Sequence, residues 1–175
     1  MDMQPEPTLI EFVLYNQWAN QKLLAACAKL EEEKSTTKIS GGYGSIQETF
    51  CHILKAETSF LKRIHGTYPE ADFKWEDNPS FAQMSAYARK VGEAFMGTIK
   101  SVPPTQNVHE EGKGWEFDYQ ARLIFMSLVY HGVAHRTDIT TYLNAQGMEL
   151  PELDVWAYQE KHPERFQAQV KRTGD

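Results

Sequence analysis

Ser45-Ile-Gln-Glu-Thr-Phe-Cys-His-Ile-Leu-Lys-Ala-Glu-Thr-Ser-Phe-Leu-Lys-Arg-Ile-His-Gly66 is the stretch of this sequence with the clearest structural pattern. Ser45 and Glu48 have the spacing of a capping box, which predicts a helix start, and Gly66 is suited to end that helix. Apolar residues recur between them at helical spacing and form one continuous face: Ile46, Phe50, Ile53, Leu54, Phe60, Leu61 and Ile64. We therefore predict an amphipathic helix that ends at Ile64 or His65.

Three other segments share this amphipathic pattern, and no convincing run of alternating residues predicts a strand. The three ranges are about Leu9–Leu30, Phe81–Val102 and Tyr119–Gln146. Thr8 and Glu11 have capping-box spacing at the first, and Asp118 is the expected N-cap of the last. Four such helices predict an all-α fold, a four-helix bundle.

The connections between these helices are long, at about 14 residues each. Residues 105–117 have the composition of a short hairpin, and a short C-terminal helix is predicted from Leu153 to Glu160. The glycine-rich run Gly41–Gly44 precedes a helix, but no strand leads into it. We interpret it as the entry to that helix and not as a phosphate-binding loop.

The composition of the chain limits the classes of protein to which it can belong. The 175 residues, 41% of them hydrophobic, predict one domain over residues 1–175, with a core at about 8–147 and a C-terminal tail at about 151–175. The net charge of −6 argues against a nucleic-acid partner. No apolar run approaches the roughly 20 residues of a membrane span, and no signal peptide is visible. Two cysteines make no disulfide framework, so we expect a cytoplasmic protein.

His131 and His135 are the residues most informative about chemistry. They are four residues apart in the last long helix and therefore lie on one side of it, among apolar residues. Two neutral imidazoles that point into a bundle can bind one metal ion. Chance alone produces about 0.2 such pairs in a chain of this composition. On this pair alone, a metal site and ordinary core or surface histidines stay equal alternatives.

A metal site needs a third ligand, and His52 is the candidate because it lies near the edge of an apolar face. Glu48, one turn earlier, is a candidate for orienting its ring. The alternative is that His52 is a hydrogen-bonded boundary residue. Cys51 points about 100° away from His52 and is not assigned as a ligand or nucleophile. No Glu-x-x-His, His-Glu-x-x-His or Cys-x-x-Cys motif occurs in the sequence.

Three polar residues interrupt the predicted apolar faces. Asn16 and Asn20 fall within the face of the first helix, where we expect them to reach water at its edge. The alternative is a hydrogen bond inside the bundle. Glu57 is the one carboxylate in the face of the second helix. We expect an internal hydrogen bond or ion pair there that joins the helices.

Three separated segments resemble the DinB/YfiT-like family of metalloenzymes. They are Tyr-Asn-Gln-Trp-Ala-Asn at 15–20, the first thirteen residues of the quoted stretch at 45–57, and His-Gly-Val-Ala-His-Arg at 131–136. The resemblance spans about Leu9 to Gly147. It implies a four-helix bundle with one divalent metal ion, often nickel or zinc, on His52, His131 and His135. It also implies a frequent homodimer and a small-molecule substrate.

The activities that the resemblance implies are thiol-dependent S-transfer, isomerisation with a low-molecular-weight thiol, and hydrolysis. The last helix departs from the family pattern His-His-Arg-Gly-Gln, because Ala134-His-Arg-Thr-Asp138 stands there. Asp138 is therefore a candidate acceptor for His135, a candidate base, or a surface carboxylate. We predict a metal-dependent transferase or hydrolase that can use a low-molecular-weight thiol. The alternative is a non-catalytic bundle that binds metal, a ligand or a partner, such as a stress-related interaction protein.

Overall fold

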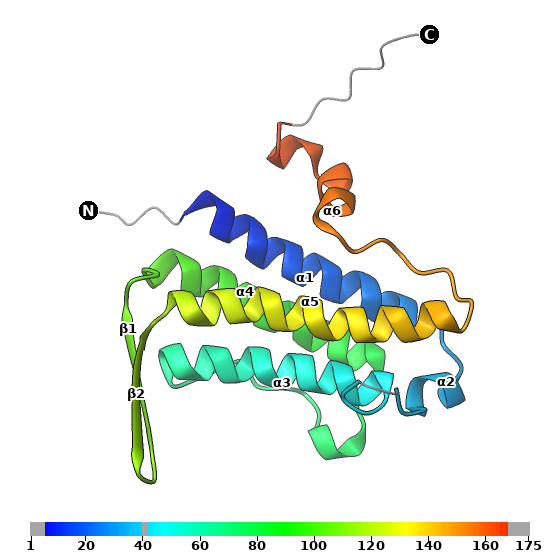
Figure 1. The fold of residues 1–175 in the computed structure, drawn as a ribbon, viewed down its shortest axis with the longest axis horizontal. Coiled ribbons are helices and arrows are strands. Elements are labelled where there is room, and N and C mark those ends of the chain that lie inside the picture. Colours follow the sequence, from blue (N-terminus) through cyan, green and yellow to red (C-terminus); the bar gives the residue numbers. More distant parts are fainter. Residues whose placement is uncertain (1–5, 40–41, 168–175) are drawn as a thin grey trace.

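The structure is a computed structural model that describes residues 6–39 and 42–167. Four long helices form a bundle (Figure 1): α1 (Pro7–Cys27), α3 (Ile46–His65), α4 (Phe81–Ser101) and α5 (Arg122–Ala145). Both α1 and α3 pack against α4 and α5, which closes the bundle around a core. The mostly helical fold predicted from the sequence is confirmed.

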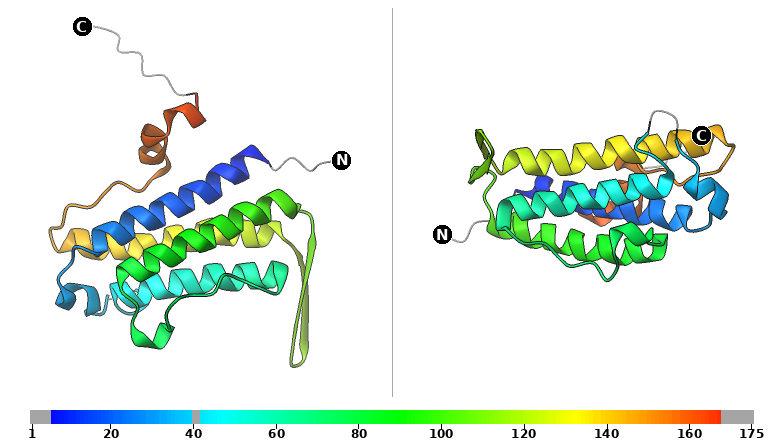
Figure 2. Two further views of the ribbon diagram at one scale, coloured as in Figure 1. Left: turned by 180° about the vertical axis from the view of Figure 1, so that it is seen from behind. Right: turned by 90° about the horizontal axis from the view of Figure 1, so that it is seen from below.

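The shorter elements connect and flank the bundle. They are α2 (Glu32–Thr36), the 3-10 helix η1 (Trp75–Asp77), the strands β1 (Asn107–Gly112) and β2 (Trp115–Gln120), α6 (Val155–Lys161) and η2 (Pro163–Arg165). After α3 the chain returns along the length of the bundle through η1 before α4 begins (Figure 2). This return explains why the connection between α3 and α4 is long.

The core of the bundle consists of large apolar side chains from the long helices. Phe50, Leu54, Met84, Phe95 and Leu128 are each at most 1% exposed. Burying one such side chain contributes roughly 1.5–3 kcal/mol, so these residues fix α3, α4 and α5 relative to one another. The two candidate ligand helices, α3 and α5, are therefore held side by side by packing.

The ends of α3 are those that the sequence predicts. The backbone N–H of Glu48 donates to Ser45 Oγ at 3.2 Å, and the backbone N–H of Ser45 donates to the Glu48 carboxylate at 2.7 Å. Gly66 ends the helix with a φ of 74°, which glycine adopts without strain. The local sequence therefore determines where the helix that bears His52 begins and ends.

Two predicted helix starts are wrong. Glu6 caps α1 instead of Thr8, because its carboxylate accepts the backbone N–H groups of Thr8 and Leu9. Tyr119 does not begin α5, because residues 115–120 pair with residues 107–112 as an antiparallel hairpin. Asp118 contacts His109 across this hairpin at 2.9 Å and caps no helix. The hairpin expected at 105–117 is confirmed and extends to Gln120.

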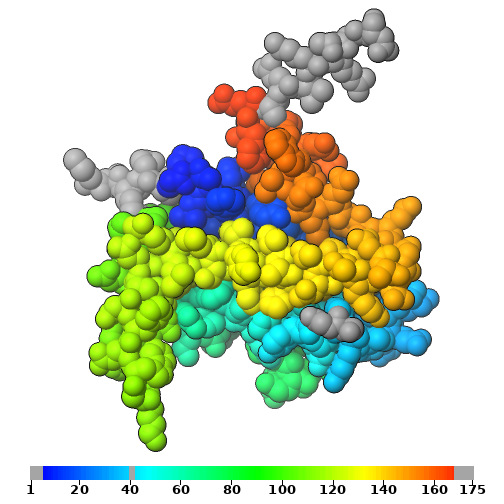
Figure 3. All heavy atoms as spheres, viewed as in Figure 1, coloured from blue at the N-terminus to red at the C-terminus, as the bar shows by residue number. Residues whose placement is uncertain are grey.

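The predicted C-terminal helix is present as α6, which Asp154 caps at its start. Tyr158 packs there against Tyr15 and Trp18 of α1. Residues 168–175 of the predicted tail and Gly41 of the glycine-rich run lie outside the described residues. Within the described ranges, no helix has both the length and the apolar character that a membrane crossing requires. Figure 3 shows how α5 covers one face of the bundle, with the segment that leads to α6 beside it.

Candidate metal centre

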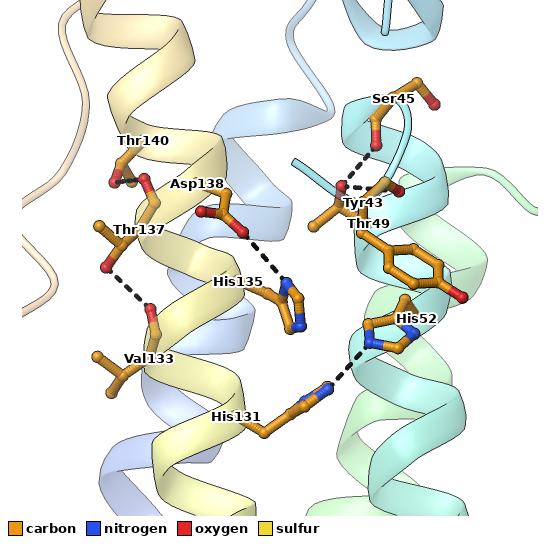
Figure 4. Close-up of polar contacts among 10 residues, drawn as sticks. All are labelled: Tyr43, Ser45, Thr49, His52, His131, Val133, His135, Thr137, Asp138 and Thr140. Atoms are coloured by element: carbon orange, nitrogen blue, oxygen red, sulfur yellow. Dashed lines mark hydrogen bonds and ion pairs between the residues drawn. The ribbon is translucent and has the colours of Figure 1, made fainter. Parts of the chain in front are cut away.

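His52, His131 and His135 converge between α3 and α5 (Figure 4). One ring nitrogen from each lies within 4.8 Å of those of the other two. His52 Nε2 and His131 Nε2 are 3.0 Å apart. The structure thus brings together all three residues that the sequence and the resemblance single out, although 79 residues separate His52 from His131.

Asp138 orients His135. Its Oδ2 lies 3.2 Å from His135 Nδ1, and the contact joins two residues one helical turn apart (Figure 4). The carboxylate accepts the Nδ1 proton in the neutral ring, which leaves Nε2 with the lone pair that a metal needs. Of the alternatives for Asp138, the structure therefore favours the acceptor for His135.

The surroundings of two of the three rings, His52 and His131, favour the neutral form. Burial, followed by the neighbouring His135 and His52, lowers the pKa of His131 to about 4. Burial and His135 also lower the pKa of His52. Neutral imidazole is the form that binds metal ions, so a set of three imidazoles fits a divalent transition-metal ion.

Tyr43 is a site residue that sequence reasoning missed. Its ring stacks on His52 with centroids 3.7 Å apart and lies 6.2 Å from the ring of His135 (Figure 4). Gly44 next to it has a φ of 87°, and a Cβ there would overlap the Glu48 carboxylate. The glycine therefore lets the chain place Tyr43 over His52. The only signal for this in the sequence is the glycine-rich helix entry.

Glu48 does not orient His52, so that prediction is wrong. Its carboxylate accepts the backbone N–H of Ser45 at the start of α3. This hydrogen bond lowers the pKa of the carboxyl group and holds it at the helix end. The stacked Tyr43 ring contacts His52 instead.

A buried polar network joins three helices behind the histidines. Asn16 and Asn20 of α1 donate to the same carboxylate oxygen of Glu57 at 2.8 and 2.9 Å. Arg136 Nη1 donates to the side-chain oxygens of both asparagines at 2.8 and 2.6 Å. Burial raises the pKa of Glu57, whereas these asparagines and Arg136 oppose the shift. The expectation for Glu57 is confirmed.

The expectation that Asn16 and Asn20 reach water is wrong, since they are 3% and 2% exposed. Their partners Glu57 and Arg136 come from other helices and satisfy them inside the bundle. Gly132 gives the network its space, because a Cβ there would overlap Asn16 Oδ1. Arg136 directly follows His135, so the network holds the backbone that carries this histidine.

These features define a class of protein: a four-helix bundle in which three histidines from two neighbouring helices can hold a metal ion. The sequence profile of the DinB family matches residues 3–169, and the chain belongs to this family. Its fold is similar to that of a DinB-like protein from Bacillus cereus. The TM-score is 0.66 with 22% identity, over 87% of this chain and 99% of that one. No curated protein matches the chain.

Proposed function

We propose that the protein holds one divalent metal ion, nickel or zinc, on His52, His131 and His135 and uses it in a reaction of a small molecule. The observation that carries this proposal is the convergence of three imidazoles from α3 and α5. Catalytic metal sites commonly have three protein ligands and an open position. The bound ion would supply Lewis acidity that lowers the pKa of a water or thiol.

The residues of this chain prepare the site in three ways. Asp138 accepts a hydrogen bond from His135 Nδ1, so that Nε2 of the same ring can act as a metal ligand. Tyr43 covers one face of the His52 ring. The buried network around Arg136 stabilises the packing of α5 against α1 and α3. Together they orient the donors before substrate binds.

Thiol-dependent S-transfer is the reaction that we propose. The support for it is the resemblance to DinB/YfiT-like proteins, among which this activity occurs. In such a transfer the low-molecular-weight thiol loses its proton to water, its sulfur forms a bond to an electrophilic carbon, and the leaving group departs with the electrons of the broken bond. The alternative reaction is hydrolysis of a small molecule, in which water takes the place of the thiol.

Metal analysis and activity test the proposal together. We expect about one ion per chain in the purified protein and its loss in the His131→Ala variant. The His109→Ala variant is the matched control, because His109 lies in the exposed hairpin. The loaded protein should accelerate the reaction of cysteine or glutathione with 1-chloro-2,4-dinitrobenzene.

The catalytic proposal would be contradicted if the loaded protein reacted no faster than the metal-free protein with every one of several thiols and electrophiles tested. A bound ion together with a large loss of thermal stability in His131→Ala and no catalysis would indicate the non-catalytic bundle instead. The homodimer and the cytoplasmic location stay proposals, and so does the lack of a nucleic-acid partner. Light scattering after gel filtration measures whether two chains associate.

A further inference from the structure

A cavity of about 570 Å³ lies beside the histidine cluster, between α3, the loop before it and the region of η1. Its lining comes from these three segments and includes Tyr43, Glu48, Cys51, His52, Lys55 and Trp75. Tyr43 and His52 connect the cavity to the histidine cluster. Both line the cavity, His52 is itself a member of the cluster, and the Tyr43 ring contacts His52 and His135. The cavity therefore adjoins the candidate metal centre.

Lys55 is the positively charged side chain in the lining of this cavity. Its ammonium group lies 5.3 Å from the centroid of the Trp75 ring, which holds the long side chain over an aromatic face. Lys55 has no ion pair within the described part of the chain. The carboxylate of Glu48, the acidic group in the lining, accepts the Ser45 backbone N–H. The positive charge of Lys55 is thus available to a ligand.

The other walls are suited to hold a ligand but not to react with it. The rings of Tyr43 and Trp75 are part of the lining and offer apolar surface to a ligand. Cys51 contacts α4, where its Sγ lies 3.8 Å from Met84 Sδ. Burial raises the pKa of its thiol, so Cys51 is not prepared to act as a nucleophile. The cavity therefore has the features of a recognition site next to a reactive one.

We propose that this cavity binds an acidic group, a carboxylate, of the small molecule that reacts at the metal centre, with Lys55 as its counter-charge. Tyr43 and Trp75 would contact the apolar part of the same molecule. This inference rests on the proposed function for the reacting end of the molecule. Binding of the acidic group itself needs Lys55 and not the metal, so the two can be tested apart.

Two probes of nearly equal shape test the inference. Calorimetry of the purified full-length protein compares 4-methylbenzoate with the uncharged 4-methylbenzamide, neither of which carries a thiol that could bind the metal. An exposed ion pair predicts that the carboxylate binds about three- to fivefold more tightly. Lys55→Met should abolish this preference, and Lys55→Arg should retain it. Lys62→Met is the matched control, an exposed lysine of α3 outside the lining.

The same measurement separates failure of this inference from failure of the proposed reaction. Equal preference in the Lys55→Met variant and the wild type, or no preference in the wild type, would overturn the inference even in an active enzyme. Loss of preference in Lys55→Met supports it, whether or not any transferase activity is found. If Lys55→Met loses the preference for the carboxylate but the protein shows no transferase activity, the cavity is still an anion-binding site and only the proposed reaction is refuted.

Discussion

Replacement of Arg136 with methionine is expected to lower the free energy of unfolding by about 3–5 kcal/mol, because it breaks a buried charged network. Arg136 is 3% exposed, and its Nη1 donates to Asn16 and Asn20. Methionine fills similar space but donates nothing. The asparagines cannot turn their amides to compensate, because their Nδ2 groups already donate to Glu57.

The magnitude follows from what the substitution leaves unpaired. Two buried amide oxygens lose their donor, at about 1–3 kcal/mol each. The Glu57 carboxylate also loses its nearest buried cation. The desolvation of the guanidinium is no longer required, which offsets part of the loss, so the lower end of the range is expected. In a chain of this size, each kcal/mol corresponds to about 2–4 °C in Tm.

Urea unfolding followed by circular dichroism at 222 nm, with chelator present, measures this effect without a contribution from bound metal. Because Glu57 without Arg136 takes up a proton more readily, the loss should be smaller at pH 5 than at pH 8. Arg89→Met is the control, since Arg89 is exposed and bonds Gln21 and Ser85. It should change stability by about 0.5 kcal/mol or less. An Arg136→Met variant within about 1 kcal/mol of the wild type would refute the reasoning.

Two further predictions concern the histidines. Asp138→Ala should weaken metal binding by about 10- to 100-fold, because His135 loses the acceptor that orients it. Competition with a chromophoric chelator measures this, and an affinity equal to that of Asp118→Ala would contradict it. Metal-free protein should lose stability as the pH falls from about 6.5 to about 4, because unfolded His131 then takes up a proton that the folded form resists. After allowance for the partial exposure of His131, we expect the free energy of unfolding to fall by about 1–2 kcal/mol over this pH range. Urea unfolding at several pH values measures this loss, which should be absent in the His131→Gln variant.

The parts of the structure that were predicted correctly depend on short stretches of sequence. The capping box of Ser45 and Glu48 and the glycine at 66 act within a few residues, and so does the period of the apolar face. The same locality explains the pairing of His131 with His135 on one side of α5. The wrong helix start at Tyr119 shows the limit, because pairing with β1 overrides a local helical pattern.

The sequence by itself determined four amphipathic helices, most of their ends, and the three histidines that the family resemblance connects. Only the tertiary structure decided the surroundings of these side chains. Asn16 is buried because Glu57, 41 residues later, and Arg136, 120 residues later, satisfy its amide. Tyr43 covers His52 because a glycine turn directs it there. The physical reason is that helix formation depends on neighbours within a turn or two, whereas burial of a polar group depends on partners that only folding brings together.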